Sequence, residues 1–309
     1  MKKILAIQSN ALNEINIETD TTLLLALEAQ KRNYQIIWYE TKDLNLIRSK
    51  VFVEGKKVRF YDKSKKFYKV IKTIKFDLAH AKVIFIRQNP PFNMDYINST
   101  HFLDHIKTKK IINNPTSIRN VSEKFYSTKF LRYMPETIFT KNIKQISSFL
   151  RKNKKIVVKP IHGYAGKNII YINKKLNQGI LKKYIKKFDH GMVQKYLNKV
   201  QEGDKRVFII NGKVKGAIRR LPRKGSILSN ISQGGIALKT KLNSRELKIS
   251  KIVATSLKKS GIFFAGIDLV GGYLIGDINV TSPTGLPQYK NLTGKNLAID
   301  FWNELEKLK

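Results

Sequence analysis

The chain has 309 residues, of which 42% are hydrophobic and 27% charged, as in a globular protein of two or three domains with a substantial core. No apolar run approaches the roughly 18 residues of a membrane span, and the absence of cysteine excludes disulfides and thiolate metal sites. The formal net charge of +38 comes mainly from lysines dispersed in small groups, which favours a compositional bias over a nucleic-acid-binding face, although it would attract anionic substrates.

The first part of the chain predicts an α/β domain that ends near residue 120. An apolar run at 2–9 predicts a strand, residues 20–33 predict a helix with Asp20 or Thr21 as N-cap, and 34–40 predict a second strand. This strand–helix–strand order indicates a parallel sheet. The first run is too short and too soon interrupted by polar residues for a signal peptide, so we expect a cytoplasmic protein.

A different pattern follows the N-terminal domain. It predicts helices at 116–131, 143–153 and 245–260, and strands at 155–160, 168–172 and 191–197, with a closing hairpin at 261–280. The segment "VVKPIHGYAGKNIIYI" places Gly163 and Gly166 in a loop between two of these strands, just after Lys159. Such glycines let backbone N–H groups approach an anion, although a plain hairpin loop explains the pattern equally well.

The hairpin "GIDLVGGYLIGDINV" carries two acids and an amide. A turn at Gly271–Gly272 would set Val270 opposite Tyr273 and Asp268 opposite Ile275, unless a bulge at Gly276 intervenes. Asp268, Asp277 and Asn279 would then share one face. Oxygen-only ligands favour Mg²⁺ or Mn²⁺, and a polar edge strand is the alternative.

Several segments in this order resemble the bacterial glutathione synthetases, which are ATP-grasp ligases. They include "INIETDTTLLLALEAQKRNY", "IRQNPPFNMDYI", "GDKRVFIINGKVKGAIRRLP" and "GIDLVGGYLIGDINVTSPTG", and the similarity covers nearly the whole chain. The resemblance implies an α/β protein of ATP-grasp architecture, with ATP held between two sheets. It divides the chain into an N-terminal parallel-sheet α/β domain (1–120), a lid subdomain (about 121–198) and a C-terminal α+β subdomain (about 199–309).

The resemblance also implies roles for the residues that match family motifs. For ATP these are Lys124, Lys159, Gly163, Tyr164, Ala165, Gly166, Gln194, Lys195, Tyr196, Leu197 and Asp204. For the metal they are Asp268, Asp277 and Asn279, for catalysis Arg206 and Arg220, and for substrate binding Arg87 and Asn230.

The implied reaction is glutathione synthesis. ATP, with Mg²⁺ or Mn²⁺, phosphorylates the carboxylate of γ-glutamylcysteine, and the amine of glycine then attacks the acyl phosphate. A polar loop at 223–235 is expected to close over the intermediate as a lid. Partners would be small molecules, with no specific nucleic acid and no membrane, and a homo-oligomer (dimer or tetramer) is compatible with this assignment. Asp268→Asn and Asn279→Ala are expected to abolish activity with little loss of folding.

The sequence departs from the family pattern by a closing hairpin that is one residue longer and by substitutions at three places. Asp277 stands where relatives usually have Glu, Ala165 replaces a glycine of the phosphate loop, and Gln88-Asn89 stand where some relatives have Lys-Asp. These changes affect the substrate assignment more than the ATP site. Two alternatives therefore stay open: another ATP-grasp ligase that joins an amino acid to a different acid or peptide, and a basic nucleic-acid-binding protein.

Overall fold

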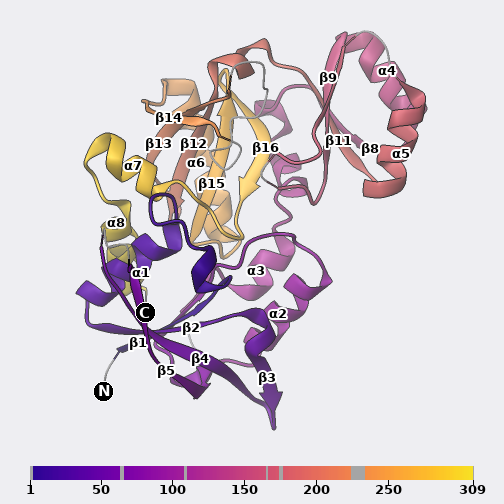
Figure 1. The fold of residues 1–309 in the computed structure, drawn as a ribbon. Helices are drawn as coiled ribbons and strands as arrows, with labels where there is room; N and C mark the ends of the chain where they lie inside the picture. The colour runs from indigo at the N-terminus through magenta and orange to yellow at the C-terminus, as the bar shows by residue number, and fades with distance from the viewer. Residues whose placement is uncertain are drawn as a thin grey trace.

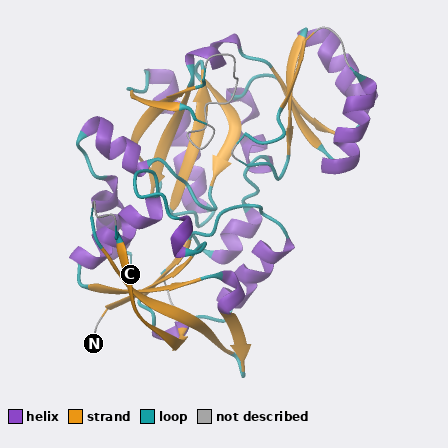
Figure 2. Cartoon of the chain, in the orientation of Figure 1, coloured by secondary structure: helices purple, strands orange, loops and turns teal. Residues whose placement is uncertain are grey.

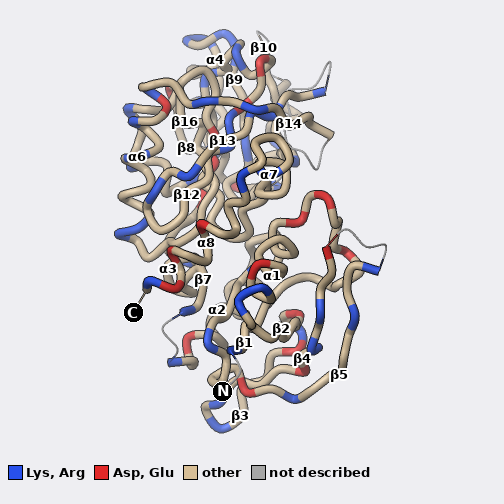
Figure 3. Tube along the Cα trace, turned by 90° about the vertical axis from the view of Figure 1, so that its left-hand side faces the viewer, with Lys and Arg blue, Asp and Glu red and all other residues tan. Residues whose placement is uncertain are grey.

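Three β-sheets, each with its own helices, make up the molecule (Figures 1 and 2). The computed structural model describes residues 3–62, 66–107, 110–164, 166–173, 177–223 and 234–308. Within these ranges, every helix is too short or too polar to cross a bilayer. Lysine and arginine recur along the whole trace (Figure 3), in keeping with the dispersed charge of the sequence.

The N-terminal sheet has seven strands, ordered β3-β4-β2-β1-β6-β7 with β5 paired to β4. Its parallel strands are β1 (Lys3–Gln8), β2 (Tyr34–Tyr39), β6 (Val83–Ile86) and β7 (Ile111–Ile112). Helix α1 (Thr21–Lys31) connects β1 to β2, which confirms the predicted strand–helix–strand unit. Its N-cap is Asp20, whose side chain accepts a hydrogen bond from the backbone N–H of Leu23 at 2.7 Å. Helices α2 (Met94–Asp104) and α3 (Pro115–Asn120) complete this part.

Three antiparallel strands extend this sheet and were not predicted, so the sheet is mixed rather than purely parallel. They are β3 (Leu44–Ile47), β4 (Lys50–Phe60) and β5 (Tyr68–Asp77). Strand β5 has no buried residue and carries several lysines, because it lies at an edge of the sheet. An edge strand that buries so little apolar surface leaves a weak hydrophobic pattern in the sequence.

The second sheet is antiparallel and has the order β10-β9-β11-β8. Its strands are β8 (Thr137–Thr140), β9 (Lys155–Pro160), β10 (Ile170–Asn173) and β11 (Gly191–Lys195). Helices α4 (Ile143–Asn153) and α5 (Gln178–Phe188) pack on one face, and their apolar side chains form a separate small core with the strands. The other face is therefore available to the rest of the protein.

The third sheet is also antiparallel, with the order β14-β13-β12-β15-β16. Its strands are β12 (Asp204–Ile210), β13 (Lys213–Leu221), β14 (Ile236–Lys239), β15 (Phe264–Val270) and β16 (Tyr273–Asn279). Helix α6 (Ser244–Lys259) covers one face and begins with a capping box in which Asn243 and Glu246 each accept from the other's backbone N–H. Two further helices follow, α7 (Leu286–Thr293) and α8 (Leu297–Glu306).

The last helix belongs to the core of the first domain. Phe301 and Trp302 of α8 are fully buried in a cluster with residues of β1, α1 and β6. The indole N–H of Trp302 donates to the carbonyl of Leu25 at 2.9 Å, and the ring lies 4.8 Å from that of Tyr34. The C-terminal segment therefore joins the third sheet to the N-terminal sheet.

The predicted helix at 116–131 is two separate elements. Helix α3 ends at Asn120, and a 3-10 helix runs over Phe125–Tyr133. Glu123 and Lys124 lie in the break between them and take part in the site described next.

Candidate active site

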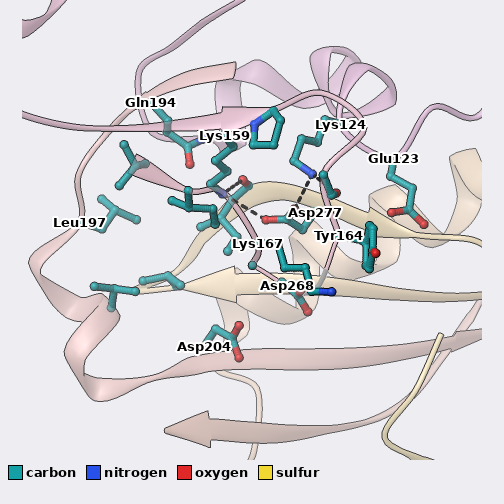
Figure 4. Close-up of a pocket in the computed structure, with 18 of the residues that line it drawn as sticks. Glu123, Lys124, Lys159, Tyr164, Lys167, Gln194, Leu197, Asp204, Asp268 and Asp277 are labelled. Atoms are coloured by element: carbon teal, nitrogen blue, oxygen red, sulfur yellow. Dashed lines mark hydrogen bonds and ion pairs between the residues drawn. The ribbon is translucent and has the colours of Figure 1, made fainter. Parts of the chain in front are cut away.

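A pocket lies between the second and third sheets, and we call it the inter-sheet pocket (Figure 4). Its walls are the uncovered face of the second sheet, the loop after β9, and the hairpin β15–β16. The cavity measures about 110 Å³, which is below the usual range for ligand sites of roughly 300–1,000 Å³.

Two buried lysines meet one carboxylate in this pocket. The Nζ of Lys159 lies 3.1 Å from Oδ2 of Asp277 and donates to the carbonyl of Ile275 at 2.9 Å. The Nζ of Lys124 lies 3.4 Å from Oδ1 of the same carboxylate. Burial would raise the pKa of Asp277, but Lys159 and Lys124 outweigh it and hold the pKa well below its usual range. Both lysines are thus held at the position where a phosphate chain could replace the carboxylate as their partner.

The loop after β9 is fixed by tight packing. A Cβ on Gly163 would lie 2.5 Å from Cγ of Pro160, and Gly166 has φ of +73°, so both positions favour glycine. Lys124 donates to the carbonyl of Gly163 at 2.8 Å and so connects this loop to the segment between α3 and the following 3-10 helix. The loop is therefore built as an anion-binding turn would be, while Ala165 lies outside the described residues.

The hairpin register differs from the prediction. Val270 pairs with Tyr273 as expected, but Ile267 pairs with Ile278, so the three residues 275–277 of β16 lie opposite Asp268 alone. The bulge centres on Gly276, whose φ is +84°. Because the bulge adds two residues, alternation survives, and Asp277 and Asn279 still share the partly exposed face. The predicted face is confirmed, the bulge anticipated at Gly276 is present, and the pairing of Asp268 with Ile275 that was expected without a bulge is wrong.

Two arginines and two aspartates form a buried network beside the inter-sheet pocket. Arg206 binds Asp268 through Nε at 2.5 Å and Nη2 at 2.9 Å. Arg220 binds Asp204 at 2.7 and 2.5 Å, and its Nη2 lies 3.0 Å from Oδ2 of Asp268. Burial opposes ionisation of Asp268, yet Arg206 and Arg220 keep its pKa below its usual range. The guanidinium planes are thus fixed by bidentate contacts.

A larger cavity of about 820 Å³ adjoins this network. Arg206, Arg220 and Asn279 line one side, and residues between β1 and α1, among them Asn10 and Asp20, line the other. The cavity is large enough for a peptide-sized ligand.

Arg87 lies beside this cavity, in a smaller pocket that shares Asn10, Asp20 and Thr284 with it. It donates through Nε to Oγ1 of Thr22 at 3.1 Å and through Nη2 to the carbonyl of Pro283 at 2.9 Å. Its Nη1 is buried and has no hydrogen-bond partner among the described residues, and burial lowers the pKa of Arg87 to about 10. An unpaired buried donor of this kind is suited to an anionic group.

Most of the residues predicted from the sequence line these cavities. Around the inter-sheet pocket are Lys124, Lys159, Gly163, Tyr164, Gly166, Gln194, Lys195, Tyr196, Leu197, Asp204, Asp268, Asp277 and Asn279. The predicted role of Asp204 in ATP binding stays a prediction, since its present partner is Arg220. Asn230 and most of the predicted lid loop lie outside the described residues.

Two charged residues that line the inter-sheet pocket were missed, Glu123 and Lys167. Their only signal in the sequence is adjacency, because Glu123 precedes Lys124 and Lys167 follows the glycine loop.

The residues of the hairpin fit a divalent metal that also binds a ligand's phosphates. Among the described residues, no three acidic, histidine or cysteine side chains converge as a metal cage. Asp277 and Asn279 offer oxygen donors beside the two lysines, and Asp277 is ionised, as a metal ligand must be. Such a partial donor set suits Mg²⁺, which usually takes one or two carboxylates and completes its shell with water and phosphate oxygens.

The fold and this pocket define the class of protein. Solved structures of similar fold include the D-cycloserine synthetase DcsG (TM-score 0.69, 14% identity, covering 99% of this chain and 100% of that one). Another is a RiPP-associated ATP-grasp ligase of Chryseobacterium gregarium, solved with ADP and peptides (TM-score 0.65, 16% identity, covering 100% and 98%). The chain has the ATP-grasp fold.

Sequence comparison identifies the family. The profile "Prokaryotic glutathione synthetase, N-terminal domain" matches residues 3–119, and "Prokaryotic glutathione synthetase, ATP-grasp domain" matches residues 123–294. Glutathione synthetase of Mesorhizobium japonicum is 35% identical over 322 residues, covering 99% of each chain. That of Buchnera aphidicola subsp. Baizongia pistaciae is 35% identical over 312 residues, covering 98% of this chain and 95% of the relative. The chain belongs to the prokaryotic glutathione synthetase family, which confirms the resemblance read from its motifs.

Proposed function

We propose that the protein joins γ-glutamylcysteine to glycine with ATP and produces glutathione, ADP and phosphate. The observation that carries this proposal, beside family membership, is the contact between two cavities of different character. The inter-sheet pocket presents lysines and a glycine loop suited to a triphosphate, and the larger cavity presents arginines suited to a peptide carboxylate. Reaction between the two ligands needs this adjacency.

The first step is phosphoryl transfer. An oxygen of the peptide carboxylate attacks the γ-phosphorus of ATP, the bond to the bridging oxygen breaks, and ADP leaves. Lys124 and Lys159 would hold the phosphates in line, and Arg206 would stabilise charge on the transferred group. A bound Mg²⁺ or Mn²⁺, held by Asp268, Asp277 and Asn279, would supply neutralising charge at the triphosphate.

The second step is attack by the amine of glycine on the acyl carbon. A C–N bond forms, the C–O bond to phosphate breaks, and phosphate leaves. Arg220, fixed by Asp204 and Asp268, would stabilise the oxyanion of the tetrahedral intermediate. Arg87, with its unpaired Nη1, would bind a carboxylate of the peptide substrate.

The test is a coupled assay for ADP. We expect ADP release with γ-glutamylcysteine to depend on glycine, and glutathione to form in equal amount. A panel of other dipeptides and acids tests the alternative, another ATP-grasp ligase. If one of these acids supports faster turnover than γ-glutamylcysteine, the proposed acid substrate is wrong.

Three further assignments are proposals of the same kind. The division into domains at about residues 120 and 198 is supported by the three sheets, which use separate stretches of the chain. A cytoplasmic site of action is supported by the need for ATP. A dimer or tetramer rests on the family resemblance, and light scattering in solution would test it.

A further inference from the structure

Four residues line both the inter-sheet pocket and the larger cavity. They are Glu123, Tyr164, Lys167 and Asn279, and we call this set the junction. A phosphoryl group that passes from a ligand in one cavity to a ligand in the other must cross between them. The junction is therefore the place at which the acyl phosphate of the proposed reaction would form.

Glu123 is the only carboxylate of the junction, and one of its oxygens is free. Its Oε1 accepts from the backbone N–H of Val280 at 3.1 Å, and from the N–H and hydroxyl of Thr281 at 3.4 and 3.0 Å. Within the described part of the chain, no group donates a hydrogen bond to Oε2. The residue is partly exposed, so Oε2 is within reach of the cavities.

The other carboxylates of the inter-sheet pocket are already paired with cations. Asp204, Asp268 and Asp277 each bind arginine or lysine at 3.4 Å or less. Glu123 has no ion pair among the described residues; burial raises its pKa, and the charge of its neighbour Lys124 opposes that rise. A carboxylate left unpaired beside so many basic groups is unsuited to phosphate and suited to a cationic ligand with N–H donors.

We propose that Oε2 of Glu123 binds the ammonium group of the attacking amino acid and holds its nitrogen beside the acyl phosphate. This inference rests on the proposed function, because it requires an amino acid as second substrate. It gives Glu123 a positioning role, and attack follows loss of the ammonium proton. Glu123 also anchors the segment after β16 through Oε1, so the test must separate substrate binding from this structural contact.

Glu123→Gln makes that separation. The amide oxygen of glutamine can replace Oε1 and keep the three accepted hydrogen bonds, while its NH₂ group replaces Oε2 and cannot accept from ammonium. We expect the KM for glycine to rise about 10- to 100-fold, because the variant loses one hydrogen bond to a charged group. The KM values for ATP and γ-glutamylcysteine should stay within about twofold of wild type. Glu123→Asp, which keeps the charge but shortens the side chain, should have a KM for glycine between those of wild type and Glu123→Gln.

Acyl phosphate formation provides the second readout. Without glycine, hydroxylamine traps the intermediate as a hydroxamate, and Glu123→Gln should form it at the wild-type rate. Glu136→Gln is the control, since Glu136 is an exposed carboxylate that pairs with Lys152 and lines neither cavity. An unchanged KM for glycine would overturn the inference, and so would a hydroxamate rate that falls in parallel with glycine use. If wild-type protein forms no hydroxamate from γ-glutamylcysteine, the proposed function itself fails.

Discussion

Replacing Asp268 with asparagine should destabilise the fold as well as stop the reaction. The carboxylate of Asp268 binds Arg206 at 2.5 and 2.9 Å and lies 3.0 Å from Arg220, and all three side chains are about 5% exposed. Without this charge, Arg206 loses its ion-pair partner among the described residues, and Arg220 keeps only Asp204. Removing one partner of a buried ion pair costs about 3–5 kcal/mol. The sequence alone predicted little loss of folding, and these contacts change that expectation.

The expected loss of stability can be expressed as a decrease in melting temperature. An unfolding entropy of about 2.1 cal/mol/K per residue gives about 0.65 kcal/mol/K for 309 residues, so Asp268→Asn should lower Tm by about 5–8 °C. Asn279→Ala is the matched comparison on the same face. It loses the donation to the carbonyl of Gly266 at 3.1 Å and a longer one to Oδ2 of Asp268 at 3.5 Å, and should cost about 1 kcal/mol, or less than 2 °C. Calorimetry gives both values, and the ADP assay should show both variants inactive. An Asp268→Asn protein that melts within 1 °C of wild type would refute the charge argument.

Three other predictions concern single charges and the basic surface. Lys159→Ala should raise the KM for ATP at least about 10-fold, because the variant lacks a buried cation at the phosphate site. Lys155→Ala, at the start of the same strand, should leave this KM unchanged. Equal KM values for ATP in the two variants would count against the phosphate role of Lys159. Glu304→Gln should cost about 1–2 kcal/mol at pH 7, since Lys213 and Asn211 bind this carboxylate at 2.9 and 3.0 Å. Burial raises the pKa of Glu304, yet these contacts outweigh it and lower the pKa from 4.5 to about 2. The stability that the carboxylate contributes is therefore complete above pH 4.5 and is lost as the pH falls through about 2. The difference in unfolding free energy between wild type and Glu304→Gln, measured with urea, should be smaller at pH 3 than at pH 7, and a constant difference would contradict this. Binding to DNA should be unselective and fall by about 1,000-fold between 50 and 200 mM salt in fluorescence anisotropy, so tight and sequence-selective binding at 200 mM would restore the nucleic-acid alternative.

Local patterns were sufficient for the elements that bury apolar residues at a regular period. Helix α4 and strand β9 lie at the predicted residues, since each presents an unbroken period between clear end signals. Strand β5 was not predicted because none of its residues is buried. The break after α3 was not predicted because the residues on both sides of it have helical composition. For the site, motifs and alternation predicted which side chains share a face. They could not predict that both oxygens of Asp268 bind arginines, because these partners lie far away in the sequence, and they left the bulge at Gly276 as an open alternative.

The packing of the last helix against the first strand bears on how the protein is made. Phe301 and Trp302 fill space that β1, α1 and β6 leave open, so the N-terminal sheet can finish its core only after some 300 residues have been synthesised. During translation, the core of the first domain therefore stays incomplete and its apolar surface exposed until the last helix has been synthesised. A ribosome-bound chain that keeps residues 297–308 inside the exit tunnel should therefore be cut by protease throughout its first 120 residues. Release of that last helix should bring protection to both ends of the polypeptide together.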